Sequence, residues 1–314
     1  MPVPVICSTN YKGGVGKTTT SRVLAQAMAE DAAFNKGKPV LVIDLDPQGN
    51  TSRRWQLLQT LQDGSRIPKP HPALAEEQPG YSSVCDLWLG LLDMGASVAP
   101  EPYKTSNPLI HVVPAHEDLM NEAMLVPKTD RPKLGLIMRG WLRDEGVEPG
   151  ERLADKYCCV IIDTQPSKTP LIDAALQAAT HCYIPFIPEP QAVEGVYSII
   201  SYVHSLSSQR GTDVPLELLG LLPNMVQSTR LHNLHLKKLR THPVFGNYLM
   251  PVKLSRRIGY SETDDWRNTP EQVTDLEGTQ IEFEARKFTR YLIAKISSSP
   301  LLAGNHTQKE TAHV

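Results

Sequence analysis

The clearest signal in this chain is the run KGGVGKTTT, residues 12–20. Only Tyr11 separates it from an apolar run, VICSTN (residues 5–10), and it opens a segment with a helical pattern. Glycines at positions 13, 14 and 16 let backbone N–H groups approach an anion without interference from a Cβ atom. The helix that follows adds the positive end of its dipole. A strand, a glycine-rich loop and a helix in this order predict a phosphate-binding loop.

Short runs rich in Val and Ile alternate with helical patterns along most of the chain, which is typical of βαβ units on a parallel sheet. Strands are expected at residues 3–9, 40–44, 110–113, 160–163, 182–187 and 218–222, with another near 248–252. Helices are expected at residues 17–30, 116–125, 132–144, 170–179, 191–208, 230–241 and 280–297. We predict one α/β domain over residues 1–300, a doubly wound and mostly parallel sheet flanked by helices, of the P-loop NTPase type.

Two segments depart from this rhythm. Residues 51–109 are rich in proline and glycine, with one short helix expected at 83–92, and we predict an insertion there. We suspect that this insertion modifies a surface that faces a partner. Residues 301–314 are polar and are expected to form a disordered tail.

The composition is that of an ordinary globular protein, with 40% hydrophobic and 21% charged residues among 314. The five cysteines are an odd number without metal-site spacing, so they are expected to be reduced thiols. No apolar run approaches the ~18 residues of a membrane span, and the amino terminus does not resemble a signal peptide. We therefore expect a cytoplasmic location and no membrane partner.

The phosphate loop departs from the strict pattern in two ways. Tyr11 stands where the first glycine is usual, and a second lysine, Lys12, begins the glycine run. With these features the loop resembles the deviant Walker A motif of the ParA/MinD family of ATPases. The resemblance continues in VLVIDLDPQGN (40–50), PAHEDLMNEAM (114–124), VIIDTQPS (160–167) and IPEPQAVEGV (187–196). Within that family, the DPQGN run is closest to partition-type ParA proteins.

The motif predicts how the loop holds a nucleotide. Lys17 would reach the β- and γ-phosphates, and the Thr18 hydroxyl would bind Mg²⁺. The other residues expected to bind the nucleotide are Gly13, Gly14, Val15, Gly16 and Thr19. The resemblance implies ATP and Mg²⁺ as ligands, weak intrinsic ATP hydrolysis, and a Lys12 that crosses a dimer interface to the partner's phosphates. From the residues alone, Lys12 is only a charge beside a phosphate site, and the alternative is a solvated lysine.

Three aspartates follow predicted strands that end beside the phosphate loop. By resemblance, Asp46 positions or activates the attacking water, Asp44 lies close to the Mg²⁺ shell, and Asp163 holds Mg²⁺ through water. Each could instead cap a helix or form a turn. Gln165 replaces a proline of the family's usual DTPPS. It is either neutral loop variation, which we favour, or a hydrogen-bond donor near the γ-phosphate.

Recognition of adenine is expected after the later strands. Asn224 matches the family position whose side-chain amide reads the base, and Pro251 could pack against the ring. An asparagine that follows a strand is also a common turn former.

A basic stretch is hidden by the net charge of −2. Residues 218–261 contain no Asp or Glu, so the rest of the chain must be acidic. The basic residues of this stretch are Arg230, Lys237, Lys238, Arg240, Lys253, Arg256 and Arg257. A charge run is often only a solvated face, but one free of acids favours an anionic partner. By resemblance, this face would bind double-stranded DNA without sequence preference.

Together these features predict a ParA-type ATPase for partition of DNA, most simply of a plasmid, in the cytoplasm and on the nucleoid. ATP would assemble a homodimer that binds DNA, and a ParB-like centromere-binding or cargo-adaptor protein would stimulate hydrolysis. One alternative is a ParA-like positioner of a protein cargo. A MinD-like regulator at a membrane surface is a weaker one, since the tail is not an amphipathic basic helix. An iron–sulfur reductase is disfavoured because Cys158 and Cys159 are adjacent.

Overall fold

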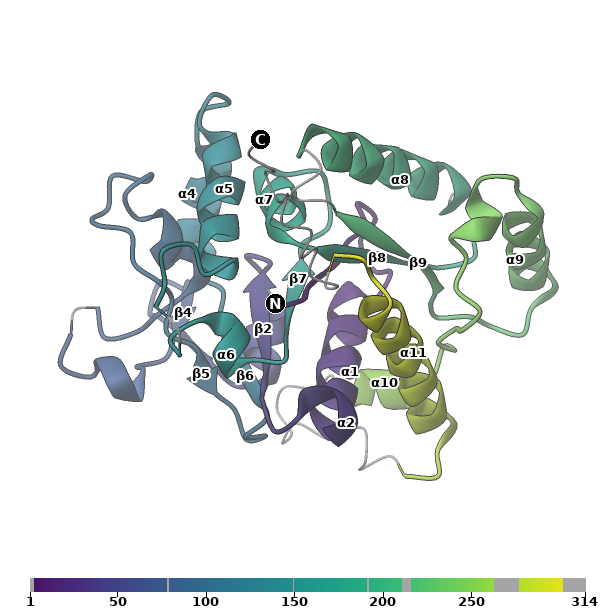
Figure 1. Cartoon of the computed structure of the whole chain (residues 1–314), viewed down its shortest axis with the longest axis horizontal. Coiled ribbons are helices and arrows are strands. Elements are labelled where there is room, and N and C mark those ends of the chain that lie inside the picture. The colour runs from purple at the N-terminus through teal and green to yellow at the C-terminus, as the bar shows by residue number, and fades with distance from the viewer. Residues whose placement is uncertain are drawn as a thin grey trace, which may run out of the picture.

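The protein is described by a computed structural model over residues 3–77, 79–148, 150–190, 192–210, 216–262 and 277–301. At its centre lies a seven-stranded sheet with the order β5-β6-β2-β7-β1-β8-β9 (Figure 1). Only the short edge strand β5 runs antiparallel to its neighbour. The strands are β1 (Val5–Ser8), β2 (Val40–Leu45), β5 (Tyr103–Lys104), β6 (Ile110–Val113), β7 (Cys159–Thr164), β8 (His181–Phe186) and β9 (Glu217–Pro223). The predicted fold class is confirmed.

Helices cover both faces of this sheet (Figure 1). Helices α4, α5, α7 and α8 lie on one face, α1, α2 and α11 on the other, and α9 beside the β9 edge. The helices are α1 (Lys17–Glu30), α2 (Ala32–Asn35), α3 (Asn50–Arg54), α4 (Glu117–Leu125), α5 (Arg131–Leu142), α6 (Leu153–Lys156), α7 (Pro170–Ala178), α8 (Ala192–Gln209), α9 (Arg230–Thr241), α10 (Ile258–Glu262) and α11 (Gln280–Ser297).

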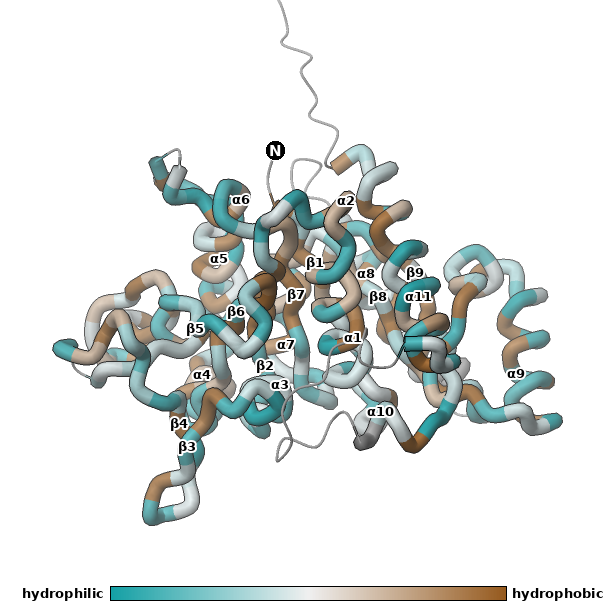
Figure 2. The backbone as a smooth tube through the Cα atoms, turned by 90° about the horizontal axis from the view of Figure 1, so that it is seen from below, coloured by the Kyte–Doolittle hydropathy of each residue, from teal (hydrophilic) through white to brown (hydrophobic). Residues whose placement is uncertain are grey.

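Burial on both faces explains why the strands read as continuous apolar runs. Successive side chains of a strand point to opposite faces. Val5 and Cys7 of β1 therefore enter the core under α5, α7 and α8, while Ile6 enters the core under α1 and α11. Figure 2 shows the same arrangement, with hydrophobic colour concentrated along the central strands.

Parallel pairing brings the carboxyl ends of three strands together. Ser8 of β1 lies opposite Asp163 of β7, and Asp163 lies opposite Asp44 of β2. The phosphate loop leaves this same edge, because it follows β1 directly. The fold thus gathers the loop and the aspartates at one end of the sheet.

The strand expected near residues 248–252 is wrong. A 3₁₀ helix covers Phe245–Asn247, and only a single bridge joins Leu249 to Leu221 of β9. Pro251 has no N–H to continue a ladder, so the pairing ends there. Gly220 permits the approach, because a Cβ at that position would lie 2.7 Å from the Tyr248 carbonyl oxygen.

The proline-rich segment contains ordered structure. After α3 it forms the hairpin β3 (Leu58–Thr60) and β4 (Arg66–Pro68), then 3₁₀ turns at Pro72–Leu74 and Val84–Trp88, and finally β5. The helix expected at 83–92 is this shorter 3₁₀ turn. Trp88 is fully buried in the main core and donates its indole N–H to the Leu134 carbonyl at 3.1 Å. Part of the segment thus completes the core under α5. The predicted tail, apart from Leu301, lies outside the described residues.

Candidate functional site

The phosphate loop has the backbone of an anion cradle. Gly14 and Gly16 adopt φ values of 71° and 82°, which an L side chain rarely adopts. A Cβ at Gly14 would meet no atom within 4 Å, so the backbone at this glycine borders open space. Gly16 caps α1 without a side-chain acceptor, and the first N–H groups of the helix remain available to a ligand.

Lys17 is the buried charge of this cradle. Its side chain is only 6% exposed, and its Nζ makes a long 3.4 Å hydrogen bond to the Lys12 carbonyl. Burial lowers the pKa of Lys17, and the carboxylates of Asp163 and Asp46 oppose that change. A buried ammonium is costly unless it is paired. The bound phosphate expected from the sequence would supply that partner.

The Asp163 carboxylate accepts hydrogen bonds from hydroxyl groups of α1 and α3. Its Oδ2 accepts from Thr51 Oγ1 at 2.8 Å and its Oδ1 from Ser21 Oγ at 3.3 Å, and Thr18 also donates to the carboxylate. Burial raises the pKa of Asp163 to about 6. Thr18 and Asp163, predicted to serve Mg²⁺, therefore lie within hydrogen-bonding reach of each other.

Asp44 and Asp46 both make local contacts. Asp44 Oδ2 accepts from the backbone N–H and the hydroxyl of Ser52 at 2.8 and 2.6 Å, and Asp44 Oδ1 accepts from the N–H of Asp46 at 3.2 Å. Asp46 is 5% exposed and accepts from the Gln48 N–H at 2.9 Å. Burial raises the pKa of both carboxyl groups. The contacts of Asp44 match the capping role that the sequence left open, and its place near Mg²⁺ stays a prediction.

Sequence reasoning missed Thr51 and Ser52, which bind the two buried carboxylates from the start of α3. The signal was the run GNTS after the aspartates, where Gly49 adopts a φ of 61° as the cap of α3. A Cβ at Gly49 would lie 2.6 Å from Leu58, so the turn needs glycine. The first residues of the proline-rich segment thus belong to the site.

The donors present fit a magnesium ion held mostly by the nucleotide and by water. No cluster of three or more His, Cys, Asp or Glu side chains among the described residues is arranged to hold a metal ion. Mg²⁺ usually keeps several waters and needs only one or two protein oxygens beside the phosphates. Thr18 and Asp163 can provide these oxygens, and the ion would neutralise charge on the phosphates.

We expect Asp163→Asn to stabilise the protein without nucleotide. A carboxyl whose pKa is about 6 in the folded protein, against ~3.9 when unfolded, holds its proton more tightly when folded. The folded state therefore loses stability as pH rises from about 4 through 6. An uncharged amide at this position would avoid this loss. In urea unfolding, the free energy of unfolding of Asp163→Asn should therefore exceed that of the wild type by up to about 3 kcal/mol at pH 7.5, and by little at pH 4.

The exposed Asp63→Asn is the matched control and should show no such gain. An Asp163→Asn protein that is less stable than the wild type at pH 7.5 would contradict this account of the buried carboxyl.

Two other predicted residues have partners within the chain. Lys12 Nζ forms an ion pair of 3.2 Å with Glu189, and both side chains are more than 40% exposed. Asn224 donates its amide to the Val15 carbonyl at 2.7 Å and so contacts the phosphate loop. Their roles toward a second protomer and toward adenine stay predictions.

Gln165 has partners within the chain. Its Nε2 donates to Thr169 Oγ1 at 2.8 Å and contacts the Met124 sulfur at 3.3 Å. Thr169 caps α7. Neither partner belongs to the phosphate loop, and the choice between neutral loop variation and a hydrogen-bond donor near the γ-phosphate stays a prediction.

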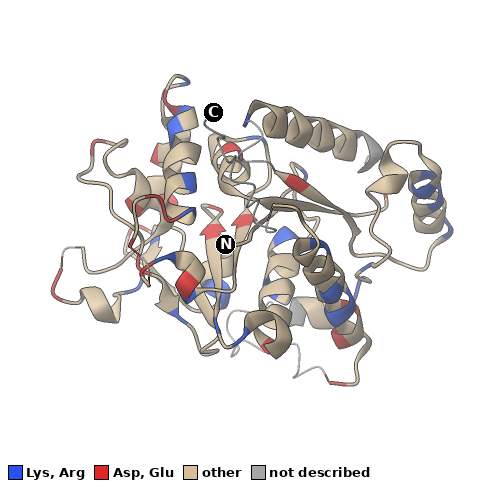
Figure 3. Cartoon of the chain, viewed as in Figure 1, with Lys and Arg blue, Asp and Glu red and all other residues tan. Residues whose placement is uncertain are grey.

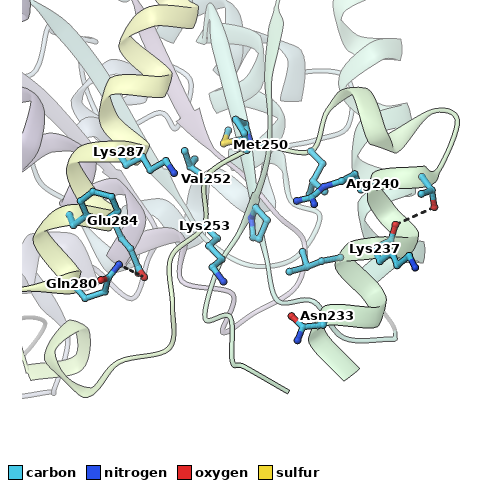
Figure 4. A pocket seen from close by; sticks show the side chains of 15 residues that line it. Asn233, Lys237, Arg240, Met250, Val252, Lys253, Gln280, Glu284 and Lys287 are labelled. Carbon is cyan, nitrogen blue, oxygen red and sulfur yellow. Dashed lines mark hydrogen bonds between the residues drawn. The ribbon is translucent and has the colours of Figure 1, made fainter. Parts of the chain in front are cut away.

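The basic stretch borders a cavity of about 730 Å³ between α9 and α11. Figure 4 shows the two helices on opposite sides, with Lys253 between them. Lys237 and Arg240 of α9 and Lys253 line it, and Lys287 of α11 adds a fourth cation that the sequence analysis did not select. Pro251 also lines this cavity, whereas Asn224 contacts the phosphate loop. Figure 3 shows Lys and Arg gathered on both helices.

The acidic group in this cavity is already engaged. Glu284 is buried and accepts from the N–H and hydroxyl of Ser255, each at 2.7 Å. Arg257 lies 3.8 Å from the same carboxylate. Arg230, Lys238 and Arg256 are exposed nearby on the chain. Among the described residues that line the cavity, the cations Lys237, Arg240, Lys253 and Lys287 are exposed, and Glu284 is the acidic one.

Comparison with known proteins identifies the family. A family described as an AAA domain matches residues 3–216. The chromosome-partitioning ATPase Soj of Thermus thermophilus is 30% identical over 265 residues, which cover 84% of this chain and 86% of Soj. The chain belongs to the ParA family of deviant Walker A ATPases. The resemblance inferred from the loop is thus confirmed, and the protein is a partition-type ParA ATPase.

Other relatives of this ParA-family protein agree. The chromosome partitioning protein ParA of Caulobacter vibrioides is 28% identical over 263 residues, covering 83% of this chain and 84% of that protein. Two solved structures share the fold. A complex of a Cyanothece McdA variant with ATP has a TM-score of 0.68 at 16% identity and covers 92% and 96% of the two chains. A putative plasmid partition protein of Borrelia burgdorferi bound to AMPPNP has a TM-score of 0.64 at 19% identity, covering 93% and 99%.

In the described part of the chain, no helix is both long and apolar enough to span a bilayer.

Proposed function

We propose that this ParA-family ATPase binds ATP with Mg²⁺, dimerises in that state, and then holds double-stranded DNA without sequence preference. A ParB-like adaptor would stimulate hydrolysis and release the DNA, so that the protein acts in the cytoplasm on nucleoid DNA. The observation that carries the proposal is a buried Lys17 in a phosphate cradle, together with a solvent-facing cationic cavity on the same domain.

At the nucleotide end, the chain supplies charge and position. The N–H groups of the loop and Lys17 would bind the phosphates, while Thr18 and Asp163 hold the ion. Asp46 is buried, and its raised pKa favours its service as a proton acceptor for the attacking water. Lys12 is exposed enough to exchange Glu189 for the phosphates of a second protomer.

At the basic face, Lys237, Arg240, Lys253 and Lys287 suit the DNA backbone rather than its bases. Contacts of this kind release counterions, so affinity should fall steeply with salt. Phe283, exposed on α11, lines the cavity, but aromatic residues are otherwise few there, which disfavours stacking on single strands. A dimer would present the face twice and so raise the affinity for one DNA molecule.

The cargo that follows from this binding is DNA, with a plasmid as our preferred candidate, and the DPQGN run favours a partition-type protein over a MinD-like one. A protein cargo remains the second candidate, since the same nucleotide switch would serve it. A MinD-like role at a membrane would be tested by flotation with anionic liposomes in the presence of ATP. We do not expect the protein to float with the liposomes.

The deciding experiment measures retention of purified protein on immobilised double-stranded DNA of random sequence with ATP, ADP or no nucleotide. We expect retention with ATP only, and none under any condition for Lys17→Ala, because this variant lacks the cation of the cradle. Lys128→Ala, which removes an exposed lysine, is the matched control and should behave as the wild type. If the wild type is retained equally with ATP, with ADP and without nucleotide, the proposal that ATP controls DNA binding is wrong.

A further inference from the structure

The turn that carries Asp46 is bound by the hairpin of the proline-rich segment. The turn is closed by the Gly49 N–H, which donates to the Asp46 carbonyl at 2.8 Å. The Gln48 N–H donates to the Asp46 carboxylate at 2.9 Å, and the Gln48 carbonyl accepts from Arg66 Nη1 of β4 at 3.0 Å. The backbone of a single residue, Gln48, therefore connects Arg66 to the carboxylate of Asp46.

The guanidinium of Arg66 is fixed by a further element. Its Nε donates to Glu117 Oε2 at 2.9 Å, in the first turn of α4, and its Nη2 lies 3.4 Å from Gln48 Oε1. The side chains of Arg66 and Glu117 are only 20% and 23% exposed. Figure 2 shows β4 beside α4, which is how the two residues meet. Because its donors point in fixed directions, one guanidinium can bind a carboxylate and a carbonyl at once.

The hairpin contacts the same turn at a second point. Leu58 of β3 packs against Gly49, where a Cβ would lie 2.6 Å from the leucine side chain. Arg66 of β4 pairs with Thr60 of β3 across the hairpin. Contacts from both strands restrict the turn more than either contact alone. The position of Asp46 therefore depends on the hairpin as well as on β2.

We propose that Arg66 is a positioning residue for ATP hydrolysis, which holds the backbone of Gln48 so that the Asp46 carboxylate is aimed at the attacking water. This inference rests on the proposed role of Asp46 as the proton acceptor. A general base must lie within hydrogen-bond reach of the proton that it takes. A misplacement of about 1 Å can lower a rate by ~10²-fold. The proposal gives the β3–β4 hairpin a part in turnover.

The test measures steady-state phosphate release by the full-length protein over a range of ATP concentrations. Arg66→Met keeps most of the length of the side chain but removes its donors, so we expect kcat to fall ~10-fold to 10²-fold. The KM for ATP should not change, because the phosphate loop and Lys17 are left in place. Arg66→Lys offers one ammonium to two acceptors and should give an intermediate kcat.

Gln59→Met is the matched control. Gln59 of β3 donates to the Pro68 carbonyl at 3.1 Å, a contact inside the same hairpin. Its loss should leave kcat at the wild-type value. If Gln59→Met and Arg66→Met lower kcat equally, the effect belongs to the hairpin as a whole and the assignment to Arg66 is wrong.

A double variant separates positioning of Asp46 from other effects. Asp46→Ala has no carboxylate to position, so adding Arg66→Met should leave its single-turnover rate unchanged. A further decrease in the double variant, a wild-type kcat for Arg66→Met, or a raised KM with an unchanged kcat would each contradict the proposal. A slow Asp46→Ala beside a normal Arg66→Met would refute the role of Arg66 alone. A wild-type rate for Asp46→Ala would instead refute the proposed role of Asp46, and the positioning role with it.

Discussion

Asp46→Ala is expected to bind Mg–ATP and dimerise but to hydrolyse ATP ~10²–10⁴-fold more slowly, the range for loss of a general base. The reason is the position of Asp46, which is buried beside Lys17 at the end of β2 and has a raised pKa. The phosphates would be held by the loop and Lys17, which this change leaves in place. Steady-state phosphate release gives the rate, and sedimentation velocity with ATP gives the dimer.

Two variants make this result specific. Asp46→Asn keeps the shape and the hydrogen bond from Gln48 but cannot accept the proton, so it should be as slow as Asp46→Ala. Asp63→Ala removes an exposed carboxylate from the turn of the β3–β4 hairpin and should turn over ATP normally. An Asp46→Ala protein that hydrolyses ATP at the wild-type rate would assign the base to another group. A variant that is monomeric in ATP would count against a purely catalytic role.

Charge reversal in the cationic cavity is expected to have the second large effect. Lys237→Glu with Arg240→Glu places two carboxylates where the proposal requires phosphate contacts, while nucleotide binding should remain. Each lost contact lowers the slope of log K against log salt by about 0.9, so the two substitutions should lower it by about 2 for each protomer that binds, or by about 4 for the dimer. Affinity for random-sequence DNA at low salt should fall by at least ~10²-fold. Fluorescence anisotropy with ATP over a salt series measures both quantities.

Lys133→Glu with Lys156→Glu is the matched control. It changes the net charge equally on α5 and α6, away from the cavity, and both lysines are about half exposed. This pair should leave the salt slope unchanged. Lys287→Glu tests the cation that only the structure revealed, and we expect it to weaken DNA binding in the same direction. If Lys237→Glu with Arg240→Glu binds DNA with wild-type affinity, the DNA interface must lie on another surface.

Local patterns in the sequence predicted much of this fold. The bounds of α1, α9 and α11 agree with the predicted ranges, because each has a clear start: Gly16 ends the loop, and Thr229 and Thr279 supply capping oxygens. The phosphate loop could be found because its residues are contiguous and its backbone needs glycine.

Features that depend on packing between distant segments could not be predicted. Thr51 donates a hydrogen bond to Asp163, which lies 112 positions later in the sequence, and no local pattern around either residue predicts this contact. Lys287 joins the basic face only because α11 packs opposite α9. The failed strand near residue 250 is different, since Pro251 already argued against a longer ladder.

The end of β9 lies between the phosphate loop and the cationic cavity. Pro223 forms part of the wall of the cationic cavity, and the next residue, Asn224, holds the Val15 carbonyl of the phosphate loop. Two consecutive residues thus join the two surfaces. A shift of the phosphate loop that moves the Val15 carbonyl pulls on the Asn224 side chain. Because Pro223 is bonded directly to Asn224, such a shift would act on the cavity wall through the backbone alone.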